Sequence, residues 1–231
     1  MVLSGNMQNN DIRTFGYVLR RTNYGEADRI LNLITPKGKF SVIAKGVRKA
    51  KSKLSGGIEM FTLADFNIHL GRGEFGILTG AKMVQYYGNI IKDFGRMELA
   101  GTIFKKISQA AENSDNPEYF KIVDESLKGL NDGEKTELVE AWFLINLAKA
   151  TGEDVNLYRD VEGKKLEADK LYIWDGYEAA FCEKANGEYG ANEIKMLRLI
   201  LTNNLEVARR VNIDNAMYGL ILKVARAVAK I

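Results

Sequence analysis

The spacing of apolar residues changes near residue 88, and this change constrains the fold more than any other feature of the 231-residue sequence. Before it, short stretches alternate apolar and polar residues between glycine-containing turns. After it, apolar residues recur every three or four positions. A period of two is typical of half-buried β-strands, and the longer period is typical of amphipathic helices. The sequence therefore predicts an α+β protein with a β region, 12–87, followed by a helical region, 88–231.

The β region contains several short stretches of aromatic and β-branched residues. Strands are predicted over 14–19, 29–34, 40–44, 60–70 and 75–87, with turns at 23–25, 35–38 and 71–73. Short strands at this spacing, separated by glycine-rich turns, favour a small sandwich or barrel. Residues 1–11 are polar and are expected to form a flexible tail.

The helical region contains several amphipathic stretches. Helices are predicted over 89–112, 117–132 and 134–150, with two or three more within 191–230. One face of the first is expected to carry Ile90, Ile91, Phe94, Met97, Ala100, Ile103, Phe104, Ile107 and Ala111. Pro117 suits the first turn of the second helix, with Asp115 or Asn116 as its cap, and Gly133 and Gly152 follow helix ends. Residues 153–189 are irregular, with two short extended pieces at 171–174 and 179–181.

Positive charge is concentrated in the first third of the chain. The net charge is only +3, but residues 1–80 contain 12 Lys and Arg against 6 Asp and Glu. The densest stretch, 37–53, has no acidic residue and seven basic ones, namely Lys37, Lys39, Lys45, Arg48, Lys49, Lys51 and Lys53. Lysine and arginine bind phosphates and release counterions from nucleic acids. We therefore predict a phosphate-backbone site here, to which Arg20 also contributes; the alternative is a solvated surface loop.

Aromatic residues are frequent in the same region. They are Phe15, Tyr17, Tyr24, Phe40, Phe61, Phe66 and Phe75. Exposed rings stack on bases in barrels that bind single strands. One or two of the seven are expected at the surface, and the others in the core.

Few residues suit catalysis or metal binding. The chain has one histidine, His69, and one cysteine, Cys182, so neither a disulfide nor a structural zinc site of about four ligands is expected. Lys45 and Ser52 lack a third catalytic partner. Glu26 and Asp28 are expected to form salt bridges with Arg29 or with the basic stretch. We predict no enzymatic activity.

Residues 71–76 match the pattern G-x-G-x-x-G of dinucleotide-binding sites. Such a site needs a helix directly after the glycines, because the helix N-terminus faces the pyrophosphate. Here the sequence after Gly76 predicts a strand. We therefore interpret the glycines as a hairpin turn and expect no cofactor; an enzyme with a nucleotide cofactor stays the disfavoured alternative.

The C-terminal helices offer a second basic surface. Its candidate residues are Arg209, Arg210, Lys223, Arg226 and Lys230, and the last three share one helix face. With apolar neighbours such as Leu220 and Ile221, they would suit an acidic peptide with an apolar end. The alternative is the solvated side of an amphipathic helix.

Four short motifs resemble the N-terminal domain of the RecO family of bacterial recombination mediators. They are YGEADR at 24–29, TPKG at 35–38, AKGVR at 44–48 and KSKL at 51–54. Their order and spacing follow the family patterns Y-G-E-x-D-R, T-x-x-G and A-K-G-x-R-x-x-K-S. The resemblance covers about residues 12–86; beyond 88 it rests on the helical pattern and on a looser likeness around 143–152.

This resemblance implies an OB-fold barrel over 12–87 and a helical domain over 88–231 with an insertion near 153–189. It implies binding of single- and double-stranded DNA, annealing of complementary strands, and help in loading RecA onto strands coated by single-strand-binding protein. RecR is the further implied partner. Some members carry a four-cysteine zinc site, but this chain keeps only Cys182 there and resembles those without zinc.

Such a function would place the protein in the cytoplasm, at the nucleoid. The sequence shows no secretory signal and no apolar stretch long enough to cross a membrane. A non-catalytic protein–protein adaptor built on an OB-fold is the alternative function.

Overall fold

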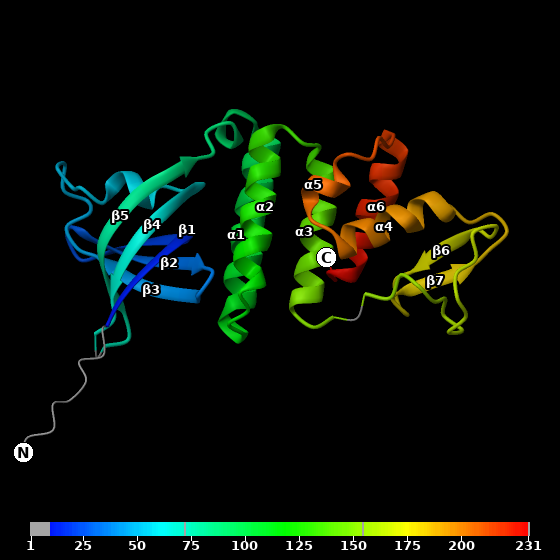
Figure 1. Ribbon diagram of the computed structural model, residues 1–231, viewed down its shortest axis with the longest axis horizontal. Helices are drawn as coiled ribbons and strands as arrows, with labels where there is room; N and C mark the ends of the chain where they lie inside the picture. Colours follow the sequence, from blue (N-terminus) through cyan, green and yellow to red (C-terminus); the bar gives the residue numbers. More distant parts are fainter. Residues whose placement is uncertain (1–9, 72, 154, 231) are drawn as a thin grey trace, which may run out of the picture. The chain divides into compact units, whose positions relative to one another are not determined.

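The computed structural model describes residues 10–71, 73–153 and 155–230. The chain divides into two units, one that ends at Tyr86 and one that begins at Tyr87 (Figure 1). The first contains the strands coloured blue to teal, and the second contains the α-helices found among the described residues.

Five strands form the first unit. They are β1 (Asp11–Tyr24), β2 (Asp28–Thr35), β3 (Gly38–Ala44), β4 (Thr62–His69) and β5 (Gly76–Tyr86). They close into a barrel in the order β1-β2-β3-β5-β4, and only the β3–β5 pair is parallel. A closed five-stranded barrel is the architecture of the OB-fold. The barrel predicted from strand spacing, and the OB-fold implied by the resemblance, are confirmed.

The barrel core is formed by every second residue of the strands. Leu31 and Leu33 on β2, Val42 on β3, and Phe66 and Ile68 on β4 are all completely buried. Successive side chains of a strand point to opposite faces, so alternate residues line the interior. The start of β1 differs from the prediction. Asp11 was assigned to the tail but pairs with His69 of β4, and the remaining predicted tail, 1–9, lies outside the described residues.

A short 3-10 helix, η1 (Ser55–Ile58), was not predicted. Its sequence has no apolar period, and tertiary contacts with β4 and β5 hold it in place. Ile58 is completely buried in the barrel core. A Cβ atom on Gly57 would lie 2.6 Å from the carbonyl carbon of Ala81 on β5. Only glycine allows this close approach of the two backbones.

Within the ranges that the structure describes, six α-helices form most of the second unit. They are α1 (Phe94–Asn113), α2 (Glu118–Asp132), α3 (Thr136–Ala150), α4 (Ala191–Thr202), α5 (Leu205–Ala208) and α6 (Asn215–Val228). α3 packs against α1, α2, α4 and α6. Its buried residues, among them Val139, Trp142 and Phe143, surround the helix, as expected of a central helix. None of the helices in the described part of the chain could span a membrane.

The helix predicted to begin at residue 89 is interrupted. A short 3-10 helix, η2 (Ile90–Lys92), comes first, and α1 then begins behind Asp93, whose Oδ1 accepts the N–H of Arg96 at 2.9 Å. The extended backbone of Asp93 breaks the helical phase. The predicted buried face was therefore wrong at Ile91, Phe94 and Met97, which are all exposed. The buried face of α1 itself is centred near Ile103, and Phe94 lies two and a half turns earlier, on the opposite side.

The other predicted helix ends lie within two residues of the observed ones, although Pro117 is itself the cap residue of α2 and directly precedes its first helical residue. Asn116 Oδ1 accepts the N–H of Glu118 at the start of α2, while Gly133 and Gly152 follow α2 and α3 with φ of 93° and 87°. A left-handed residue after a helix is favourable for glycine, since it has no Cβ.

The two predicted extended pieces of the irregular segment are confirmed as β6 (Tyr172–Asp175) and β7 (Ala180–Glu183), which pair as an antiparallel hairpin. Phe181 is completely buried, and the rings of Tyr172, Trp174 and Tyr189 approach it edge-on at centroid distances of 6.2, 5.0 and 5.4 Å. Such contacts, together with the area buried, stabilise the segment. No cluster able to hold a metal ion occurs within the described residues.

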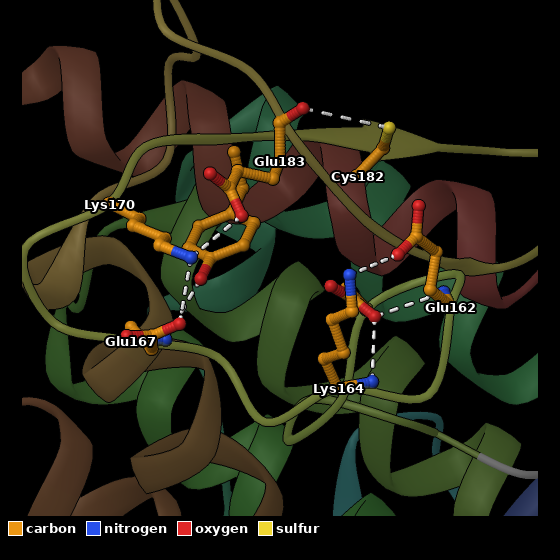
Figure 2. Close-up of polar contacts among 8 residues, drawn as sticks. Glu162, Lys164, Glu167, Lys170, Cys182 and Glu183 are labelled. Carbon is orange, nitrogen blue, oxygen red and sulfur yellow. Dashed lines mark hydrogen bonds and ion pairs between the residues drawn. The ribbon is translucent and has the colours of Figure 1, made fainter.

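Ion pairs cover the outside of this segment (Figure 2). Lys170 lies between Glu167 and Glu183, with Nζ–O distances of 2.7 and 3.0 Å, and Lys164 pairs with Glu162 at 2.5 Å. These side chains are largely solvated, so the pairs contribute little to stability. Packing around Phe181 therefore stabilises this segment more than the ion pairs do.

Gly57→Ala should destabilise the barrel. The new methyl group would collide with the backbone of Ala81, which cannot move aside without disturbing β5. Overpacking of this kind costs about 1–3 kcal/mol, or at least about 4 °C in the melting temperature of a small unit. Calorimetric unfolding checks this. Gly56→Ala is the matched control, because nothing lies within 4 Å of its Cβ position; equal melting temperatures for the two variants would contradict the close packing.

Candidate nucleic-acid interface

The predicted basic stretch is divided by a strand. Lys37 lies in the turn before β3 and Lys39 near the start of that strand, whereas the other five basic residues follow its end. A strand of seven residues spans about 20 Å at about 3.3 Å per residue. We call residues 45–53, with Lys45, Arg48, Lys49, Lys51 and Lys53, the cationic loop. The structure separates Lys37 and Lys39 from this loop.

Three hydrogen bonds attach the cationic loop to the β1–β2 turn. Gly46 adopts a φ of 63° and donates its N–H to Asp28 Oδ1 at 2.7 Å. The N–H of Arg48 donates to the carbonyl oxygen of Ala27 at 2.9 Å, and its guanidinium donates to that of Gly25 at 3.3 Å. Three bonds thus fix the start of the loop against the turn.

Asp28 and Arg29 have roles other than the predicted salt bridge. The Asp28 carboxylate accepts a backbone N–H of the basic stretch, and Arg29 Nε donates to Asn23 Oδ1 at 3.3 Å. The prediction was wrong because the carboxylate lies closer to the loop backbone than to a basic side chain. Glu26 is exposed in the turn.

The five basic side chains of the cationic loop are exposed. Within the described ranges, none of them forms an ion pair with an acidic residue. Other barrel arginines are paired: Arg13 with Asp65 at 2.5 Å, and Arg21 with Glu59 at 2.8 Å. The cationic loop therefore combines uncompensated charge with a fixed attachment.

The three remaining predicted basic residues lie elsewhere on the barrel. Arg20 is exposed on the outer face of β1, where it pairs across to Asn32 of β2. Lys37 Nζ donates to the carbonyl oxygen of Arg13 at 3.3 Å. Lys39 is partly buried and pairs in register with Ile34. Arg20 shares the outer face with Tyr24, which ends β1 beside the turn that holds the loop.

Two of the seven aromatic rings are half exposed, as predicted. Tyr24 is 52% exposed and Phe15 is 50% exposed, whereas Tyr17 and Phe66 are completely buried. Tyr24 pairs with Asp28 across the β1–β2 turn. Phe15 lies about 30 Å earlier along β1 and pairs with Asp65. Of the two exposed rings, Tyr24 is the one next to the cationic loop.

The glycine-rich motif is a hairpin turn. Gly76 is the first residue of β5, so the predicted strand is confirmed, and Arg72 lies outside the described residues. Ser52 Oγ accepts the N–H of Leu54 at 3.3 Å, a contact within the loop. His69 Nδ1 lies 2.8 Å from Asp11 Oδ1 at the surface. Ser52 and His69 thus each have a local hydrogen-bond partner.

The basic residues near the C-terminus are paired with the chain's own acids. Arg209 binds Glu134 and Glu206, Arg210 binds Glu206, Lys223 binds Glu188, Arg226 binds both oxygens of Glu140, and Lys230 binds Glu153. The hydrogen bonds from Arg209 and Arg210 lower the pKa of Glu206. Ile221 is buried and cannot reach a peptide. These pairings favour the alternative interpretation, a solvated helix face.

A closed five-stranded barrel in this strand order defines the class, an OB-fold protein, and this one carries an exposed cationic loop. Two family models match the chain. One, described as recombination protein O N terminal, matches residues 7–87, and the other, recombination protein O C terminal, matches residues 107–228.

Curated relatives carry the same description. The DNA repair protein RecO of Dehalococcoides mccartyi strain CBDB1 is 31% identical over 215 residues, 88% of this chain and 83% of the relative. The DNA repair protein RecO of Alkaliphilus metalliredigens is 24% identical over 225 residues, 93% of this chain and 91% of the relative. The chain belongs to the RecO family of DNA repair proteins, and the resemblance of the four motifs is confirmed.

Asp28→Ala should release the cationic loop from the turn. The partly buried Gly46 N–H would lose its acceptor, and a hydrogen bond to a charged group is worth about 1.5–3 kcal/mol. We expect amide hydrogen exchange at Gly46 to accelerate at least about tenfold, which corresponds to about 1.4 kcal/mol. Asp28→Asn keeps an oxygen acceptor and should retain most of the protection, and Glu26→Ala serves as the exposed control. Unchanged exchange in Asp28→Ala would show that the carboxylate does not hold the loop.

Proposed function

We propose that the cationic loop binds the phosphate backbone of DNA and that the protein acts as a recombination mediator. In this proposal it binds and anneals single strands, also binds duplex DNA, and assists the loading of RecA onto strands coated by single-strand-binding protein. The observation that carries the proposal is the set of five exposed basic side chains in residues 45–53 without acidic partners among the described residues.

Such a loop suits binding that does not depend on base sequence. Each contact between a cation and a phosphate releases counterions whatever the base. Annealing brings two like-charged strands together, and a concentrated positive field lowers their repulsion. Binding and annealing need neither a nucleophile nor a metal ion, so we propose that the protein is not an enzyme.

The resemblance to RecO proteins supports the proposed partners. RecR and single-strand-binding protein are inferred from that resemblance alone, as is a place in the cytoplasm at the nucleoid. Arg20, Lys37 and Lys39 are proposed as outlying phosphate contacts, because they lie on the same barrel but outside the cationic loop.

Replacing Lys45, Arg48 and Lys51 together with alanine should weaken binding to single-stranded DNA and flatten its dependence on salt. Three lost contacts at about 0.7 per phosphate lower the slope of log K against log salt by about 2. Fluorescence anisotropy of a labelled thymidine oligonucleotide across a salt series measures this slope.

The control removes the same charge from the helical unit. Lys105, Lys184 and Lys195 are exposed there, and their joint replacement with alanine should leave the slope nearly unchanged. An unchanged slope in the loop variant, or equal losses in both variants, would reject the site. Failure of the wild-type protein to stay on immobilised single-stranded DNA at physiological salt would favour the protein–protein adaptor.

A further inference from the structure

Tyr24 is a large aromatic residue on the surface of the barrel. It is the last residue of β1, and it is 52% exposed. Within the part of the chain that the structure describes, its side chain makes no hydrogen bond and no contact with another ring. The ring is therefore open to a ligand.

The backbone around Tyr24 is fixed relative to the cationic loop. Gly25, the next residue, accepts a hydrogen bond from the guanidinium of Arg48, and Asp28, its cross-strand partner, accepts the N–H of Gly46. The strand end that carries the exposed ring and the loop that carries the cations are thus held together by hydrogen bonds within one unit. Sites for single strands combine these two elements, a positive groove for phosphates and an aromatic platform for bases.

We propose that Tyr24 stacks on an unpaired base while the cationic loop binds the neighbouring phosphates. This inference rests on the proposed function of the loop and adds the residue by which the barrel would distinguish an unpaired base from a stacked one. A duplex keeps its bases stacked inside, so it can reach the cations but not the ring. Phe15 is a poorer candidate, because it pairs with the carboxylate-bearing Asp65 and lies about 30 Å from Tyr24 along β1.

Stacking and charge have different signatures in a salt titration. A ring carries no charge, so its loss weakens binding without changing the number of counterions released. Loss of one stacked base lowers affinity about 5- to 150-fold. Replacing basic residues of the cationic loop should change the slope of log K against log salt. Replacing Tyr24 should change only the intercept of that plot.

The test compares four proteins on three labelled ligands. The proteins are the wild type, Tyr24→Ala, Tyr24→Phe and the control Phe15→Ala; the ligands are a thymidine oligonucleotide, an abasic strand of equal length, and a duplex. Tyr24→Ala should bind the thymidine strand about 5- to 150-fold more weakly at unchanged salt slope, and bind the abasic strand and the duplex like the wild type. Tyr24→Phe keeps the ring and should bind all three normally. Phe15→Ala is the matched control for loss of an exposed ring on the same strand.

The outcomes separate this inference from the proposed function. Normal binding of the thymidine strand by Tyr24→Ala overturns the stacking, and so does an equal loss on all three ligands, which would indicate a displaced loop. In both cases phosphate binding is still tested independently, by the salt dependence of the variant with Lys45, Arg48 and Lys51 replaced. Wild-type binding without salt dependence would instead overturn the proposed function.

Discussion

The hydrogen bond from the Gly46 N–H to Asp28 is the interaction on which the candidate site depends. It joins residues 18 positions apart and attaches a loop of mutually repelling cations to a tight turn. Five unpaired positive charges would otherwise favour extended conformations, in which their repulsion is lowest. The carboxylate accepts a backbone N–H in place of a side-chain cation, so it holds the loop in position and leaves the Lys and Arg side chains available.

The cationic loop and the C-terminal helices use their basic residues in opposite ways. In the helical unit, Arg209, Arg226 and Lys230 pair with carboxylates 75 to 86 residues away, between segments that pack together. In the cationic loop, the positive charges stay exposed to solvent. Exposed ion pairs contribute at most about 1 kcal/mol each, so leaving the loop unpaired costs the fold little. The charge that remains is what a polyanion would neutralise.

Membership of the RecO family and the structure of the barrel are consistent with each other, and each adds different information. The family matches identify a DNA repair protein. The structure adds how this chain presents its cations, and it places Tyr24 beside them. It also shows how the segment with Cys182 is packed, with Phe181 surrounded by three aromatic rings.

The sequence by itself determined the elements of this protein, because period, turn glycines and helix caps report on neighbours along the chain. Alternation predicted the strands of the barrel, and Gly133 and Gly152 marked helix ends that have positive φ. Only the tertiary structure decided which cations are free, since pairing depends on residues far apart in sequence. In the folded chain, β3 separates the two parts of the basic stretch, and Arg226 forms an ion pair with Glu140. The Asp28 carboxylate accepts the backbone N–H of Gly46. The tertiary structure also placed Gly57 against Ala81, because η1 has no apolar period of its own and follows the packing around it.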